Sequence, residues 1–407
     1  MDVTLTLDRS FKQDAPITRY RINSIDILRG LVMVIMAIDH TRDYFHIGAF
    51  TGDPLDPATT TPALYFTRWI THYCAPVFVF LAGTSAYLSG LKKTKNELSI
   101  FLFKRGLWLV LVEVLIVTLG ISFNPLYNAI FLQVIWAIGI SMILLSLLIW
   151  LPFKAIMAIG LLIVLGHNLL DYPEAARNGN VGFWWDLLHK GNFAIYPIGN
   201  NHALVIIYPF LPWVGIMTLG YCFGALYQRK VDPAVRRKWL FALGAGAIVL
   251  FIVLRFINGY GNPLQWTAQQ DTWKNIFAFL NVQKYPPSLM FTTMTLGPAM
   301  IALALLEKVQ NRVTAFFAIY GRVPFFYYIA HFYLIHLLCA IAFFATGHTT
   351  DQIVTPQFPF LFRPPTFGFS LGVVYLVWIF VIAILYPLVK KYDAYKQRNK
   401  KWWLSYL

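Results

Sequence analysis

Residues 24–48, SIDILRGLVMVIMAIDHTRDYFHIG, decide the fold because they place an apolar run between two groups of charged residues. Residues 30–38 carry no charge, and charged side chains lie on both sides of them. The hydrocarbon core of a bilayer is about 30 Å thick, and a helix needs roughly 20 mostly apolar residues to cross it. The stretch is therefore predicted to be the first transmembrane helix, with polar groups near both of its ends.

The composition of the chain extends this interpretation to the whole protein. Of 407 residues, 58% are apolar and 13% are charged, whereas soluble domains carry about 25% charged residues. A soluble globular enzyme and a disordered chain are both excluded. The three cysteines, at 74, 222 and 339, lie far apart within apolar runs and are predicted to be core residues, without a disulfide or a zinc site.

Apolar runs of spanning length recur along the chain. The predicted spans are 25–46, 69–91, 100–120, 129–151, 153–170, 203–227, 238–258, 287–306, 315–345 and 369–391. The ninth is too long for one straight helix, and residues 321–324, Gly-Arg-Val-Pro, are the expected break. The predicted fold class is all-α: a polytopic membrane helical bundle of about ten transmembrane helices.

The basic residues predict how the bundle is oriented. They gather at 9–21, 92–105, 229–238, 308–312 and 390–401, and ten spans put all five groups on one side. By the positive-inside rule this side is the cytoplasm, so both termini are expected there. The net charge of +15 is then explained mostly by the orientation of the helices in the membrane, and it does not indicate binding of nucleic acid. We expect a cytoplasmic segment at 1–24, one transmembrane domain at 25–391 and a basic cytoplasmic tail at 392–407.

The end of the first span holds the strongest candidate site. Asp39, Arg42, Asp43 and His46 share one stripe of a helix, and Asp43 is three residues from both His40 and His46. A carboxylate that orients an imidazole makes it a suitable general base near neutral pH. The alternative is a salt cluster that neutralises itself at the outer membrane interface.

Further polar residues lie near the same boundary. Arg68 and His72 begin the second span, which one loop joins to the first, so their side chains are expected to line a shared cavity. His202 is a third candidate for contact with substrate, although a plain loop residue is its simplest interpretation. For His72 the alternative is a side chain that only faces water.

Three ionisable residues lie deeper in predicted spans. Glu113 is expected either to be protonated and hydrogen-bonded to a neighbouring helix or to line the cavity. His331 and His336 are five residues apart, about 140° around a helix, so they are poorly placed as a metal pair. One of them is a candidate for facing the cavity, and no metal is expected.

In several of its motifs the chain resembles the heparan-alpha-glucosaminide N-acetyltransferase catalytic-domain family. Residues 21–30 resemble its R-x-x-S-x-D-x-x-R-G motif, and residues 76–85 resemble its P-x-F-V-F-x-x-G-x-S stretch. Leu132-Gln133 and the segment 208–215, YPFLPWVG, resemble further elements of the family. The resemblance implies a multi-span membrane acyltransferase that takes acetyl from cytosolic acetyl-CoA and delivers it to an amine on the far side.

The resemblance also implies roles for individual residues. The family's active histidine lies in a Y-F-x-H-like context, which residues 44–46, Tyr-Phe-His, match one position out of register, so His40 and His46 both remain candidates for the base. Asp39 or Asp43 would orient it, and Arg42 would stabilise the oxyanion. The candidates for binding the phosphates of acetyl-CoA are Arg29, Lys92, Lys93, Lys104, Arg105 and Arg237. Asp26 and Arg29 are equally well explained as a structural ion pair.

The resulting prediction is an integral membrane enzyme of a plasma membrane, here the bacterial inner membrane. Its expected partners are lipid, an acyl-CoA and a periplasmic or extracellular sugar bearing an amine or hydroxyl, with a homodimer as a further candidate and no nucleic acid. The alternative function is a proton-coupled transporter or flippase, in which the same Asp, Arg and His side chains carry protons or a small polar or lipid-linked substrate.

Overall fold

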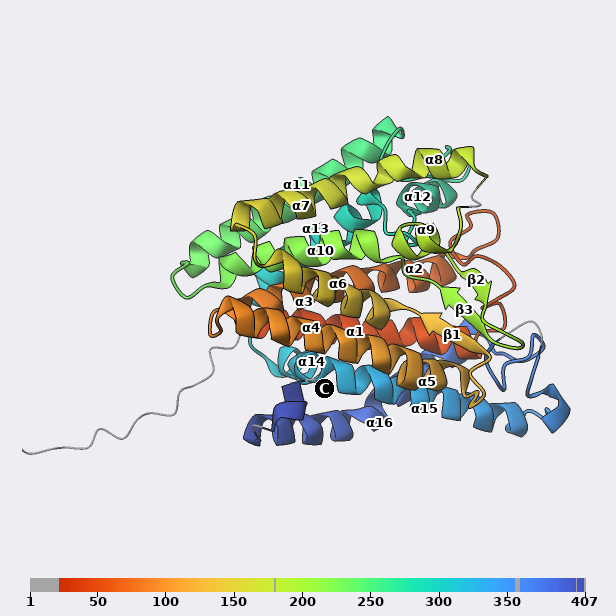
Figure 1. Ribbon diagram of the computed structural model, residues 1–407. Coiled ribbons are helices and arrows are strands. Elements are labelled where there is room, and N and C mark those ends of the chain that lie inside the picture. The colour runs from red at the N-terminus through yellow and green to blue at the C-terminus, as the bar shows by residue number, and fades with distance from the viewer. Residues whose placement is uncertain (1–21, 179–180, 356–358, 400, 406–407) are drawn as a thin grey trace, which may run out of the picture.

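The computed structural model describes residues 22–178, 181–355, 359–399 and 401–405, and long helices running side by side make up most of them (Figure 1). The longer helices are α1 (Asn23–Phe45), α3 (Cys74–Gly90), α4 (Lys95–Val112), α6 (Val134–Leu148), α7 (Phe153–Gly166), α10 (Phe210–Phe223), α11 (Pro233–Ile257), α13 (Leu289–Leu306), α14 (Arg312–Arg322), α15 (Pro324–Ala345) and α16 (Leu371–Arg398). The shorter ones are α2 (Pro62–Ile70), α5 (Thr118–Ser122), α8 (Asp171–Ala176), α9 (Phe183–Leu188) and α12 (Thr272–Leu280). Most of the predicted N-terminal segment, residues 1–21, lies outside the described residues.

Seven helical segments of the described chain are long and apolar enough to cross a membrane. They are α2–α3, α7–α8, α10 with its following turn, α11, α13, α15 and α16. The other three predicted spans correspond to α1, to the segment from α4 to α5 and to α6. Charged residues fall inside α1 and α4, a π-helical turn at Glu113–Val117 separates α4 from α5, and α6 is apolar but only 15 residues long. An integral membrane protein is therefore supported, while the count of ten remains a prediction.

One feature departs from the all-α prediction. The strands β1 (Ala129–Leu132), β2 (Ala194–Pro197) and β3 (Ala203–Ile206) form a small sheet in the order β1-β3-β2. β3 is parallel to β1 and antiparallel to β2. The predicted spans 129–151 and 203–227 therefore begin with strands, because short runs rich in Ile, Val and Phe fit a strand as well as a helix.

The predicted break in the ninth span is confirmed. α14 ends at Arg322 and α15 begins at Pro324, which occupies the first helical turn, where its missing N–H costs nothing. At the C-terminal end, α16 continues to Arg398, past the predicted start of the tail at residue 392.

α1 lies at the centre of the bundle, in contact with α3, α13, α14, α15 and α16. Glycines allow the backbones of α1 and α14 to touch, since a Cβ at Gly30 would lie 1.7 Å from the carbonyl oxygen of Phe317. A Cβ at Gly321 would lie 1.8 Å from the carbonyl oxygen of Asp26. Close packing at small residues is how transmembrane helices associate.

The bundle has two distinct ends (Figure 1). The sheet, α9 and α12 lie at one end, which we call the sheet end. The first described residues and the C-terminal turns of α16 lie at the other, which we call the terminal end. The polar residues that close α1 are therefore placed at the sheet end, next to the strands.

Candidate active site

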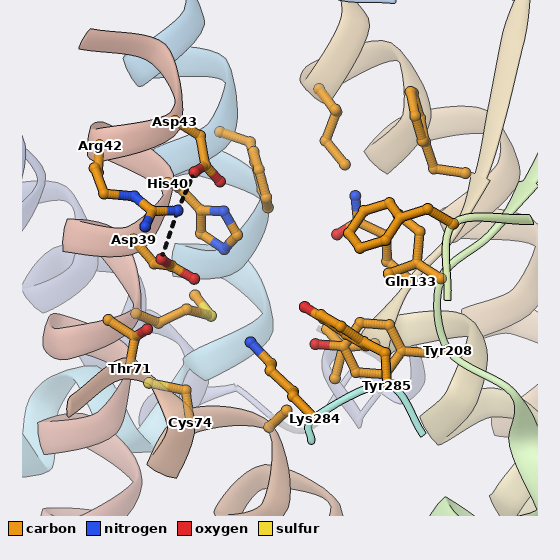
Figure 2. A pocket seen from close by; sticks show the side chains of 18 of the residues that line it. Asp39, His40, Arg42, Asp43, Thr71, Cys74, Gln133, Tyr208, Lys284 and Tyr285 are labelled. Carbon is orange, nitrogen blue, oxygen red and sulfur yellow. Dashed lines mark hydrogen bonds and ion pairs between the residues drawn. The ribbon is translucent and has the colours of Figure 1, made fainter. Parts of the chain in front are cut away.

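A cavity of about 510 Å³ opens at the sheet end. Its walls come from the last turns of α1, the start of α3, the three strands, α15 and two loops that precede α13 and α16. Figure 2 shows the side chains of α1 on one side of this space, with Gln133, Tyr208 and Tyr285 on the other. Segments far apart in the sequence thus meet at one pocket.

The charged residues at the end of α1 line this cavity and pair with one another. Arg42 Nη2 lies 2.6 Å from Asp43 Oδ1 and 3.4 Å from Asp39 Oδ1. Arg68, from α2, donates a short hydrogen bond to the second oxygen of Asp39. We predicted that Asp39 or Asp43 pairs with a histidine. In the described residues both carboxylates pair with guanidinium groups instead. Arg42 Nε and Nη1 are buried without a hydrogen-bond partner in the described chain.

His40 is the predicted histidine that the fold brings to the cavity. Its ring packs on Phe332 with the centroids 4.2 Å apart and lies 5.2 Å from the ring of His331, both on α15. His331 Nδ1 lies 3.0 Å from the carbonyl oxygen of Tyr327 and must donate to it. The Nε2 atom of a neutral His331 is therefore an acceptor, and it is buried without a partner among the described residues.

The other three predicted histidines do not line this cavity. His46 follows the last residue of α1, where the chain turns to pair with Phe369. His72 lies in a turn before α3 and packs against Phe291 of α13, 5.3 Å between ring centroids. His202 precedes β3 and its Nδ1 lies 3.0 Å from the carbonyl oxygen of Tyr127, at an exposed position. The prediction that several histidines line one cavity is therefore corrected: of the four, only His40 lines the cavity in the described structure.

Two of the deeper polar residues have structural partners. Glu113 accepts hydrogen bonds from the backbone amides of Gln133 and Trp136, at 3.0 and 3.2 Å, and so caps the start of α6. It lines neither of the two cavities described here. His336 Nε2 lies 2.9 Å from the carbonyl oxygen of Leu361, and His336 Nδ1 lies 3.2 Å from the carbonyl oxygen of Gly120. The predicted hydrogen bonding of Glu113 to a neighbouring helix is confirmed, and the predicted protonation of Glu113 stays a prediction.

The opposite wall carries a polar group that was not predicted from the sequence. Lys284 and Tyr285 come from the loop between α12 and α13, and the amine of Lys284 reaches into the space that α1 faces (Figure 2). Burial would raise the pKa of Tyr285, but the neighbouring cations Lys284 and Arg68 lower it below its ordinary value. No local signal singled out Lys284, because the predicted outer loops also contain other basic residues, such as Arg177 and Lys190.

A second cavity, of about 250 Å³, lies at the terminal end and is basic. Of the residues predicted to bind phosphate, Arg29 and Arg105 line this cavity. Arg322 and Lys396 also line it and were not predicted. Arg29 donates to Ser85 Oγ at 2.9 Å and lies 3.5 Å from Asp26, so it serves both the ion pair and the cavity. The four predicted residues outside the lining are Lys92, Lys93, Lys104 and Arg237. The first three of these have exposed side chains, while the fourth is half-buried.

The two cavities share a wall. Met36, Phe78, Val134 and Tyr328 line both of them. The bundle therefore contains a basic chamber and a chamber with His, Asp, Arg and Lys, with mostly apolar side chains between them. Such an arrangement can hold an anionic molecule at one end and a reacting polar group at the other.

One cluster elsewhere has the composition of a metal site. The ligand atoms of Asp171, Glu174 and His189 lie within 4.8 Å of one another. Glu174 Oε1 lies 2.6 Å from both His189 Nδ1 and Trp185 Nε1. Protein donors therefore already satisfy this carboxylate, and the cluster lines neither cavity.

The helical bundle, its apolar spans and its paired chambers define a protein that works within a membrane. A family model described as "Heparan-alpha-glucosaminide N-acetyltransferase, catalytic" matches residues 21–255, more than half of the chain. The chain belongs to this family, whose description implies a transferase of acetyl groups. Comparison with curated proteins gave no match. The matched region ends within α11, so Lys284, Tyr285 and all of α15 lie outside it.

Proposed function

We propose that the protein transfers an acetyl or other acyl group from cytosolic acyl-CoA to an amine or hydroxyl of a sugar on the outer side of the membrane. The observation that carries this proposal is the pair of chambers that share a wall, one basic and one bearing His40. Ten spans, with both termini in the cytoplasm, make the terminal end cytoplasmic and the sheet end outer. The membrane is a plasma membrane, in a bacterium the inner one.

In this proposal the basic chamber takes the donor. The nucleotide end of acetyl-CoA is polyanionic, and guanidinium groups match phosphate oxygens in shape and charge. Arg29 and Arg105 contact the phosphates first, and Arg322 and Lys396 extend the same basic surface. Lys92, Lys93, Lys104 and Arg237 attract the coenzyme from outside the chamber. The neutral pantetheine arm then points toward the apolar wall between the chambers.

The reaction takes place in the chamber at the sheet end. The amine or hydroxyl of the acceptor attacks the thioester carbonyl carbon while His40 removes its proton. The carbon–sulfur bond breaks, and the thiolate of CoA leaves toward the basic chamber. Arg42, two of whose donor atoms have no partner among the described residues, stabilises the oxyanion, and Asp39 and Asp43 hold Arg42 in place.

The acceptor enters from the sheet end. Lys284 and Tyr285 are well placed to bind its polar groups, and Arg68 supports Asp39 beside them. Phe131 and Phe360 stack with ring centroids 5.8 Å apart and supply an apolar wall for the sugar ring. His72 and His202 keep a proposed role in acceptor binding, and His46 a proposed role as the base, only through movement of the segments that carry them.

The test uses purified full-length protein in detergent, radiolabelled acetyl-CoA and a panel of amino sugars. We expect acetyl-CoA binding and the formation of an acetylated sugar. The transporter alternative also fits two chambers at opposite ends of a bundle. It would be favoured if acetyl-CoA failed to bind while proteoliposomes accumulated a solute in proportion to a pH gradient.

A further inference from the structure

Tyr328 occupies a distinctive place on α15. It is one of four residues that line both chambers, and the other three, Met36, Phe78 and Val134, are apolar. Its side chain is 4% exposed. The phenol is therefore the polar group at the crossing between the chambers.

The hydroxyl of Tyr328 is buried and has no hydrogen-bond partner among the described residues. Its ring packs instead against the rings of His331 and Phe332, with centroids 5.6 and 5.3 Å away. A buried hydroxyl without a partner costs free energy, so such groups are uncommon in native structures and call for an explanation. A ligand that bridges the two chambers would supply the missing partner.

The position of the hydroxyl matches one atom of the proposed donor. A coenzyme whose nucleotide lies in the basic chamber and whose acetyl group reaches His40 must cross the shared wall with its thioester. His40 packs on Phe332, one turn after Tyr328 on the same helix, so the base and the hydroxyl approach the same region. A thioester carbonyl oxygen accepts a hydrogen bond, and a phenol donates one.

We propose that Tyr328 binds the acyl donor by donating a hydrogen bond from its hydroxyl to the thioester carbonyl oxygen. This inference rests on the proposed function and adds a catalytic residue to it. As the acceptor nitrogen or oxygen bonds to the carbonyl carbon, negative charge grows on the carbonyl oxygen and the hydrogen bond strengthens. The acceptor proton goes to His40, the carbon–sulfur bond breaks, and Tyr328 keeps its own proton.

The variant Tyr328→Phe tests the proposal because it removes the hydroxyl and keeps the ring. Tyr327→Phe is the matched control, since Tyr327 is the preceding residue, is fully buried and lines neither chamber. Its hydroxyl, like that of Tyr328, has no hydrogen-bond partner in the described part of the chain. We expect Tyr328→Phe to lower kcat by about 100-fold, as removal of an oxyanion donor does, with the KM for acetyl-CoA within about twofold. Tyr327→Phe should leave both values unchanged.

A second measurement does not depend on turnover. With ¹³C-labelled acetyl-CoA and no acceptor, the infrared stretch of the bound thioester carbonyl should lie at lower wavenumber in the wild type and in Tyr327→Phe than in Tyr328→Phe. Equal wavenumbers in all three proteins, or an unchanged kcat in Tyr328→Phe, would overturn the role of Tyr328 alone. Failure of the wild type to bind acetyl-CoA would overturn the proposed function, and this inference with it.

Discussion

Replacing Arg68 by methionine removes one of the two cations that pair with Asp39. The side chains of Arg68 and Asp39 are 15% and 11% exposed, so the pair is largely shielded from water. Loss of one partner from a buried ion pair costs about 3 to 5 kcal/mol, because the other charge stays buried without compensation. Arg42 remains 3.4 Å from Asp39, but it is shared with Asp43, which places the expected cost near the lower end, at about 3 kcal/mol.

A loss of about 3 kcal/mol raises the unfolding equilibrium constant by roughly 100-fold, since each 1.4 kcal/mol is a factor of ten. The assay is reversible denaturation in mixed detergent micelles, followed by tryptophan fluorescence. Arg237→Met is the control, because Arg237 is half-buried and no ion pair of this residue appears in the described structure. It should change the free energy of unfolding by less than about 0.5 kcal/mol.

The double variant Asp39→Asn/Arg68→Met completes the cycle. Removing both charges should recover most of the stability that Arg68→Met loses, because the uncompensated carboxylate is gone. If the double variant were as unstable as the sum of both single variants, the two side chains would not be coupled, and the ion-pair account of this cluster would be refuted.

Three further predictions concern catalysis, packing and pH. His40→Ala should lower kcat by a factor of about 100 to 10,000, whereas His46→Ala should retain most turnover; a full-rate His40→Ala protein would reject the base assignment. Gly83→Ala should destabilise the fold by about 1 to 3 kcal/mol in thermal denaturation, because its Cβ would meet the carbonyl oxygen of Met217 at 2.0 Å, while Gly246→Ala, with open space around it, should be neutral. In the proposed function the neutral phenol of Tyr285 donates a hydrogen bond to the acceptor. The KM for the acceptor should therefore rise as the pH rises through the lowered pKa of Tyr285, and Tyr285→Phe should abolish that rise.

The sequence was most informative about features that depend on the residues of a single helix. The polar residues at 39–43 follow an uncharged run on one helix, so their shared face and depth could be predicted, and the break before Pro324 follows from the geometry of proline. Each of the ten predicted spans contains a helix of the bundle, although two of them begin with a strand, because apolar length is a local property.

The rest depended on contacts between distant segments. Asp39 pairs with Arg68 because α2 brings this arginine to α1, and the spacing of residues in the sequence does not show that contact. The pairing of Arg42 with Asp39 and Asp43, in contrast, is local to α1. Lys284 and Tyr328 reach the chambers from segments far from α1 in sequence, so nothing local marked them as site residues. Two strands of the sheet, β1 and β3, were missed because their four residues begin longer apolar runs that were predicted to be spans. The third, β2, lies in a predicted loop between two spans.

The central claim is that the shared wall between the chambers is where an acyl group passes from one side of the membrane to the other. Sealed proteoliposomes test it directly, with radiolabelled acetyl-CoA enclosed and glucosamine outside. The account predicts labelled N-acetylglucosamine in the outer solution, and none when donor and acceptor are both added outside. Product formed only when the two are on the same side would contradict it.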